Sequence, residues 1–150
     1  YAVTGHEPTL HHSLAMVSKR IPRGVVCLLS ALAYHDIGTQ LPSVVWLAID
    51  QRSRPLVTTD LPAKIVRFGA RSLVEGVEEH SVEGVTMRIT NPAKTVADCF
   101  KFRNKVGLDI AMEALRDAWR KRKVTMAELD RFAATNRVTH VMRPYLEMLT

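Results

Sequence analysis

Hydrophobic positions in the first part of the chain repeat with the spacing of helices. Within residues 11–21, leucine, valine and isoleucine recur every three or four positions; Ser13 is a candidate cap and Pro22 ends the run. Residues 25–34 (VVCLLSALAY) are apolar on almost every side, which is typical of a helix buried on most of its surface. The pattern therefore predicts two N-terminal helices.

The middle of the chain predicts a small sheet. Residues 44–49 (VVWLAI) form an apolar run rich in β-branched side chains, so we expect a strand covered on both faces, in the middle of the sheet. Residues 64–68 (KIVRF) are a shorter candidate strand. Residues 76–81 and 85–89 flank Glu83-Gly84, and the second run alternates apolar and polar side chains, which predicts a hairpin.

Helical patterns return near residue 91. Asn91 is a candidate cap and Pro92 suits the first position of a helix that we expect to reach about residue 103. Residues 108–122 carry an alanine and leucine stripe at helical spacing. A capping-box signature, Thr125-x-x-Glu128, introduces another helix, and a last one over residues 138–149 contains Pro144, which should start it or bend it.

The order of these elements predicts an α/β or α+β fold. We expect a small mixed sheet of about four strands, two N-terminal helices and a helical C-terminal half. The chain has 150 residues, of which 47% are hydrophobic and 24% charged, and this length suffices for one core without a metal or disulfide. Residues 13–150 are expected to form that domain. Residues 1–12, which show no clear periodicity, are expected to be a linker from an upstream part.

Cysteine usage and hydropathy indicate the compartment. Cys27 and Cys99 lie in apolar stretches, where free cysteines of a reducing compartment are commonly buried. No window approaches the roughly eighteen apolar residues of a membrane span, and no secretory leader opens the chain. We therefore expect a cytoplasmic protein without a membrane partner.

Motifs that would carry chemistry are few. The histidines form no set with metal-ligand spacing, and the glycines form no phosphate-binding loop or dinucleotide fingerprint, so we expect no catalytic residues, no cofactor and no metal. One alternative stays open, a metal-dependent nuclease-like domain acting on nucleic acid. Asp50, Asp60 and Lys64 would form its site, if the bend at Pro62 brings the last two onto a common face.

The charged residues suggest contacts with a polyanion or a protein partner. The formal net charge is +6 and the pI is near 9.7, a modest excess that a solvated surface also explains. Lys94 and Asp98 stand at i and i+4 of a predicted helix, where they form either a surface ion pair or an anchor for a partner. The candidate contact residues are Lys94, Asp98, Lys101, Arg103, Arg116, Arg120, Lys121, Arg122 and Lys123.

Several blocks of the sequence resemble the AbiEi-type antitoxin and transcriptional regulator family. They are residues 23–32 (RGVVCLLSAL), 45–49 (VWLAI), 75–80 (EGVEEH) and 91–101 (NPAKTVADCFK), with further likeness over residues 103–109 and 142–146. The resemblance spans nearly the whole chain. Its most specific part is the Pro-Ala-Lys-Thr-Val-Ala-Asp block.

The resemblance implies an α/β C-terminal domain that follows a winged-helix domain, here missing, through which the protein binds operator DNA. Members are encoded beside a nucleotidyltransferase-like toxin in abortive-infection (type IV toxin–antitoxin) systems. The antitoxin represses its own operon and counteracts the toxin functionally, not necessarily by contact. A homodimer would place paired winged helices over repeated half-sites. The family supplies no catalytic residues, so a regulator and an enzyme acting on nucleic acid are the two classes to separate.

Overall fold

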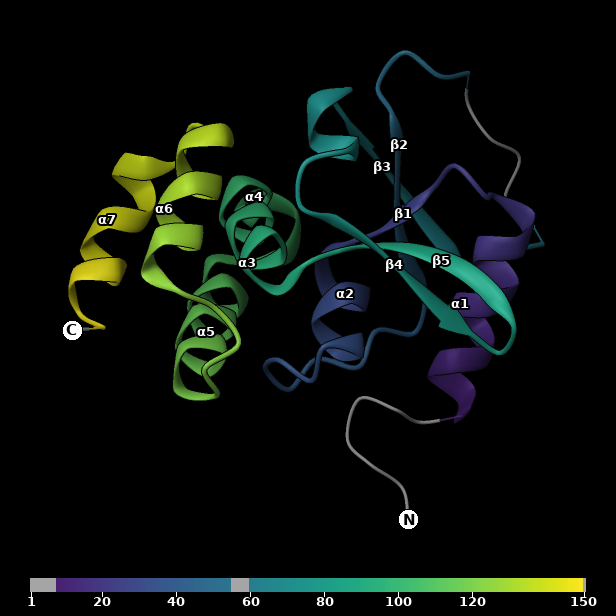
Figure 1. Cartoon of the computed structure of the whole chain (residues 1–150), viewed down its shortest axis with the longest axis horizontal. Helices are drawn as coiled ribbons and strands as arrows, with labels where there is room; N and C mark the ends of the chain where they lie inside the picture. The colour runs from purple at the N-terminus through teal and green to yellow at the C-terminus, as the bar shows by residue number, and fades with distance from the viewer. Residues whose placement is uncertain (1–7, 55–59, 150) are drawn as a thin grey trace.

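A computed structural model describes residues 8–54 and 60–149 (Figure 1). The strands are β1 (Val25–Val26), β2 (Val45–Asp50), β3 (Ala63–Phe68), β4 (Val77–Val82) and β5 (Val85–Thr90). The helices are α1 (Pro8–Arg20), α2 (Leu28–Tyr34), the short 3-10 helix η1 (Arg71–Leu73), α3 (Pro92–Lys101), α4 (Arg103–Val106), α5 (Leu108–Arg120), α6 (Met126–Thr135) and α7 (Thr139–Glu147). The mixed α/β fold expected from the sequence is confirmed, with five strands instead of four.

The sheet has the order β3-β2-β1-β5-β4 and mixes parallel and antiparallel pairs. The two-residue strand β1 is its centre: Val25 pairs with Ala48 of antiparallel β2 and with Arg88 of parallel β5. Two predictions are therefore wrong: residues 25–26 are a strand and not part of a helix, and the strand predicted over residues 44–49 is not the middle strand of the sheet. Periodicity cannot separate a short buried strand from a buried helix when every residue is apolar.

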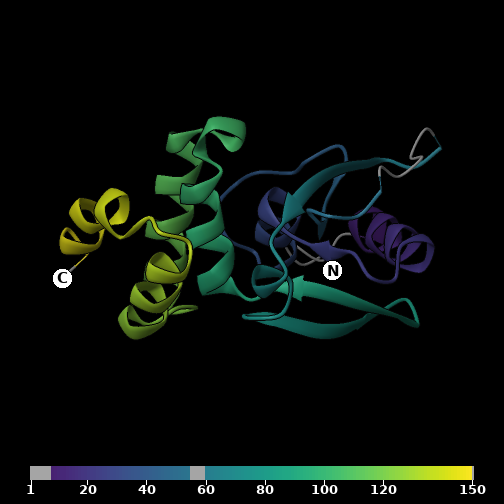
Figure 2. The ribbon, with the colours of Figure 1, turned by 90° about the horizontal axis from the view of Figure 1, so that it is seen from above.

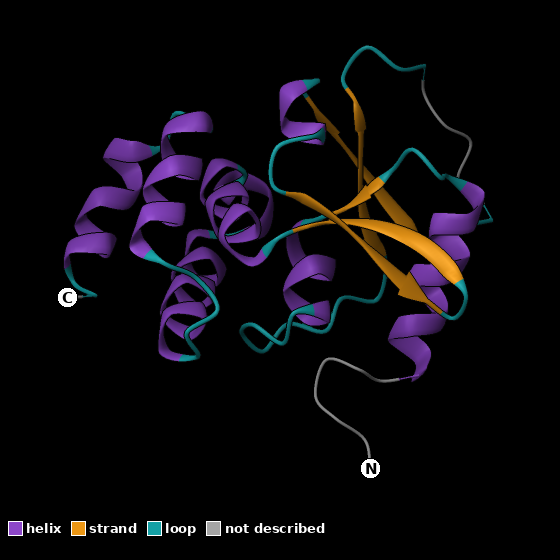
Figure 3. Ribbon diagram, viewed as in Figure 1, coloured by secondary structure: helices purple, strands orange, loops and turns teal. Residues whose placement is uncertain are grey.

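Two apolar cores lie on the two faces of the sheet. On one face, Leu14 and Val17 of α1 pack against Leu47 and Met87. On the other face α2 packs against β2 of the sheet and α3 packs against α2; α5 and α6 pack onto α3, and α7 packs onto α6 (Figure 3). Figure 2 shows the β2–β3 and β4–β5 pairs diverging on either side of α1. None of the described helices has both the length and the apolar character that a membrane crossing requires.

Local signals in the sequence place most of the turns and caps. The two-residue loop Glu83-Gly84 has positive φ angles of 49° and 78°, as a type I′ turn requires, so the predicted hairpin is confirmed. Asn91 accepts a hydrogen bond from Lys94 N at 2.8 Å, with Pro92 at the first helical position. The capping box of Thr125 and Glu128 is present.

Some helix boundaries differ from the prediction. Helix α1 begins at Pro8, so Ser13 lies inside the helix and does not cap it. Residues 8–12, expected to belong to a linker, are the first part of α1, whereas residues 1–7 lie outside the described residues. Pro144 neither starts nor precedes α7 but lies within it. Cys27 and Cys99 are buried free thiols, as expected.

Three helices end in the same way, with a residue in the left-handed conformation. Asp36, Arg122 and Arg137 follow α2, α5 and α6 with φ angles of 58°, 58° and 59°. In each case two backbone bonds close a Schellman motif; after α6, for example, Arg137 N donates to Ala134 O and Val138 N to Ala133 O. Glycine is the usual residue at this position because a Cβ is disfavoured there.

We predict that Arg137→Gly raises the free energy of unfolding by about 1 kcal/mol, because it relieves the left-handed strain of a residue with a Cβ. Urea unfolding followed by circular dichroism measures this. Arg137→Ala is the matched control, since it removes the same exposed side chain and charge but keeps the Cβ. An equal gain in both variants would mean that charge, and not backbone conformation, sets the effect.

Candidate functional sites

The predicted surface pair of Lys94 and Asp98 is in fact buried. Lys94 is 1% exposed and Asp98 0% exposed, so the expectation that they form a solvated pair or a partner contact is wrong. Their spacing along α3 is visible in the sequence, but the packing of α2, α5 and α6 around α3, which buries both side chains, is not. A helix that is polar at two positions can still be buried on all sides.

The two side chains join elements from both halves of the fold. Lys94 Nζ donates to Ser72 Oγ of η1 at 2.8 Å and to Asp98 Oδ1 at 3.3 Å, and it lies 5.2 Å from the centre of the Phe68 ring. Asn136 Nδ2, at the end of α6, donates to the same Asp98 Oδ1 at 2.8 Å. The pair thus ties β3 and η1 to α6 through α3.

The surroundings of the Lys94–Asp98 pair, called the buried joint below, leave little room for a larger side chain. A Cβ on Gly76 would lie 2.8 Å from Lys94 Cδ and from the Phe132 ring, and Gly76 has a φ of 74°, so both space and conformation require glycine. Asp98 Oδ2 has no hydrogen-bond partner among the described residues. Burial raises the pKa of Asp98, although Lys94 and Asn136 act in the opposite direction.

We predict that Lys94→Met lowers the free energy of unfolding by about 3–5 kcal/mol, because it leaves the Asp98 carboxylate buried without its cation. The double variant Lys94→Met, Asp98→Leu should regain most of that loss, since both buried charges are then absent. Urea unfolding at neutral pH measures both. A loss below about 1 kcal/mol in the single variant, the size typical of exposed pairs, would contradict the buried joint.

Most of the basic residues predicted as contacts are divided between the two ends of α5. Lys101 and Arg103 lie before its first residue, and Arg120 to Lys123 at its other end, about 20 Å away for a helix of 13 residues. Arg103 Nη1 donates to Phe100 O at 2.8 Å. The structure therefore does not bring the nine candidates together as one surface.

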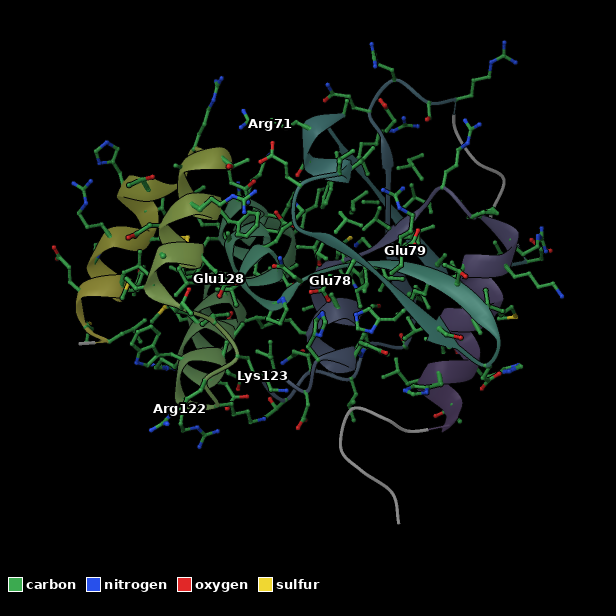
Figure 4. All side chains as sticks on the ribbon, viewed as in Figure 1. Arg71, Glu78, Glu79, Arg122, Lys123 and Glu128 are labelled. Carbon is green, nitrogen blue, oxygen red and sulfur yellow. The ribbon has the colours of Figure 1, made fainter. Side chains whose placement is uncertain are left out.

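Two lysines of the basic run stabilise the end of another helix. Lys121 Nζ donates to Asp36 O at 2.8 Å, and Lys123 Nζ donates to His35 O, so both cap carbonyls just after α2. Arg120 pairs with Asp117 on its own helix. Arg116 and Arg122 are exposed and form no ion pair with a described residue, and Figure 4 shows Arg122 pointing away from the ribbon. Structural and exposed cations are therefore interleaved at this end of α5.

Carboxylates of α5 hold the loop that follows α2. Gly38 N donates to Asp117 Oδ2 at 2.7 Å, and Thr39 Oγ1 donates to Glu113 Oε2 at 3.1 Å. Partial burial alone would raise the pKa of Asp117. The hydrogen bond from Gly38, with those from Arg120 and Lys121, outweighs this effect and lowers the pKa to about 2.

We predict that Asp117→Asn destabilises the protein at neutral pH by on the order of 2 kcal/mol, because the lowered pKa is stabilisation gained on folding. A carboxyl with a lowered folded pKa stabilises above its unfolded value of 3.8 and loses this contribution as the pH falls towards about 2. Thermal unfolding from pH 7 to pH 2 measures it. Wild type and variant should converge at the acid end; parallel curves for Asp117→Asn and the wild type would refute the assignment.

The alternative nuclease site is not assembled. In the parallel β2–β3 pair, Asp50 is level with Phe68 and Lys64 with Trp46, so Lys64 lies four positions, about 13 Å, from Asp50 along the strands. Lys64 Nζ instead sits 4.7 Å from the centre of the Trp46 ring. Asp60 is exposed and bonded to Arg20 at 2.9 Å, a hydrogen bond that lowers its pKa. The three residues predicted for that chemistry therefore do not lie together in one site.

A hydrogen-bonded chain that the sequence analysis missed links β4 to α2. Glu78 Oε1 lies 2.9 Å from His80 Nε2, and His80 Nδ1 lies 3.2 Å from Tyr34 Oη. Burial and the nearby Glu78 raise the pKa of the Tyr34 phenol. Glu78 and His80 are two positions apart in a predicted strand, and this spacing places their side chains on the same face. Nothing in the sequence brings Tyr34 to them.

The chain matches no protein-family model and no curated protein. Over the residues that the structure describes, no group of three or more His, Cys, Asp or Glu side chains is arranged to hold a metal ion.

Proposed function

We propose that this chain is the C-terminal domain of an AbiEi-type antitoxin and transcriptional regulator that has no catalytic activity of its own. In this proposal the full protein binds operator DNA through an N-terminal winged-helix domain, represses its own operon and counteracts a nucleotidyltransferase-like toxin. The described domain positions that DNA-binding part and supplies surfaces for macromolecular partners.

One observation carries the proposal: in the Pro92–Lys101 block, which contains the most specific part of the resemblance to the family, three polar side chains are buried and bonded within the protein. They are Lys94 and Asp98 in the buried joint, and Thr95, whose Oγ1 forms a hydrogen bond of 2.6 Å with Thr90 Oγ1. A block that serves to join two halves of a domain is what a regulatory scaffold requires. An active site would need some of these groups open to a substrate.

The proposal is tested by co-expressing the full-length protein with the nucleotidyltransferase-like protein encoded beside its gene. We predict that the wild type and Asp50→Asn restore growth of cells carrying that toxin, because no described carboxylate is required for chemistry. The measurement is the growth rate after toxin induction, with protein levels compared by immunoblot.

Two results would overturn the proposal. One is the absence of a nucleotidyltransferase-like neighbour, or no rescue by the wild type at normal protein levels. The other is loss of rescue by Asp50→Asn with unchanged protein levels, which would favour the hypothesis of a nuclease-like domain. Lys94→Met is the control for a folding defect, since it should lower rescue together with the protein level.

A further inference from the structure

A groove opens where the central strand of the sheet begins. Strand β1 starts only at Val25, so the end of β2 and the first half of β5 have no strand between them. The two strand pairs diverge at this point (Figure 2). The resulting cavity has a volume of about 600 Å³, within the range of ligand pockets, and its apolar lining consists of Ile21, Pro22, Ile49 and Leu73.

Arg88 spans this groove. Its side chain donates through Nη2 to Leu73 O at 2.7 Å and through Nη1 to Arg23 O at 3.3 Å, and thereby connects one wall to the other. These acceptors are neutral carbonyl groups, so they hold the guanidinium in place without cancelling its charge. Glu79 is the cross-strand neighbour of Arg88 but forms no ion pair with it within 4.0 Å.

Two further arginines line the cavity, and others lie in the turn that contributes Ser53 to its lining. Arg20 and Arg23 line one wall, and the turn after β2 carries Arg52 and Arg54. Arg67 Nη1 donates to Ser53 O at 2.7 Å and to Gln51 O at 3.3 Å, which fixes this turn, again through neutral carbonyls.

The local carboxylates offset only part of this charge. Asp60 pairs with Arg20 at 2.9 Å and Asp50 with Arg52 at 3.6 Å. Six arginines, including Arg88 and Arg67, therefore stand against three carboxylates with Glu79 included, and Arg23 and Arg54 form no ion pair with any described residue. The groove keeps an excess of positive charge.

The type of cation indicates the type of ligand. All six cations are arginines, and Arg23 and Arg54 form no ion pair with a described residue. The planar fork of such an arginine matches a phosphate group with two parallel hydrogen bonds, whereas a lysine offers only a point charge. The arginines belong to α1 and the residues that follow it, to β3 and β5, and to the turn after β2, so they are more numerous than a single phosphate ion needs. The apolar floor between them suits the faces of unpaired bases or of sugars, which a duplex does not present.

We propose that this arginine groove binds the phosphate backbone of a single nucleic-acid strand. The proposal does not depend on the regulatory function proposed above, because it concerns a different end of the molecule from α5 and needs no toxin. Aromatic side chains are absent from the described lining of the groove, so binding should be governed by phosphate contacts and depend little on sequence.

The test measures fluorescence anisotropy of a labelled oligothymidylate of about twelve nucleotides over a range of salt concentrations. The variant Arg23→Gln, Arg54→Gln removes two charges whose side chains form no ion pair with the described protein. We predict that it weakens binding about tenfold at low salt and reduces the slope of log affinity against log salt by about 1.4, the value for two lost contacts to a single strand. Arg23→Lys, which keeps the charge, should lose less than Arg23→Gln.

The matched control is Lys105→Gln, Arg143→Gln, which removes the same net charge from exposed positions in the helical half. It should leave both affinity and slope close to the wild type. Equal losses in the two double variants would overturn the proposal, because binding would then follow net charge alone. Absence of wild-type binding, binding of the matching duplex only, or preference for oligoglutamate over the strand would overturn it as well. These readouts use the purified chain, so they are independent of the rescue experiment.

Discussion

One buried ion pair, Lys94 with Asp98, joins the two halves of this protein inside their shared apolar core. The partners of the pair, Ser72 of η1 and Asn136 after α6, come from opposite sides of α3, so the pair links the helical half to the sheet. Burying two charges is costly, and the hydrogen bonds of Lys94 Nζ and Asp98 Oδ1 offset only part of that cost, because Asp98 Oδ2 has no partner among the described residues. An apolar joint of the same volume could be as stable, but it would specify the orientation less sharply.

The described cations differ in whether their charge is used inside the protein or can contact a ligand. Lys94 is enclosed, and Lys121 and Lys123 cap the carbonyls that follow α2, so these three contribute to the net charge of +6 without forming a binding surface of their own. The arginines of the groove differ, because Arg67 and Arg88 are held by neutral carbonyl oxygens and keep their charge. A charge that is positioned but not neutralised is what binding of a polyanion requires.

The groove and the joint have a common origin in the brevity of β1. A longer central strand would pair with β2 and β5 along their whole length and close the gap between them. Because β1 has only two residues, the chain turns at once into α2, whose burial brings α3 onto the same face. One end of the sheet is thus left open while the opposite face is tightly covered. In the proposed regulator, a rigid covered face suits a scaffold and an open charged end suits a nucleic-acid contact.

The mixed α/β class follows from the amino-acid sequence, as do the hairpin at Glu83-Gly84, the cap at Asn91 and the capping box at Thr125, because each depends on residues close together in the chain. Long-range packing was needed to show that Val25 and Val26 form the central strand and that Lys94 and Asp98 are buried. It was also needed to show that Arg20, Arg23 and Arg88 line one groove. Helical spacing tells which side chains share a face but not what covers that face, and strand order brings distant residues together in a way that no local pattern records.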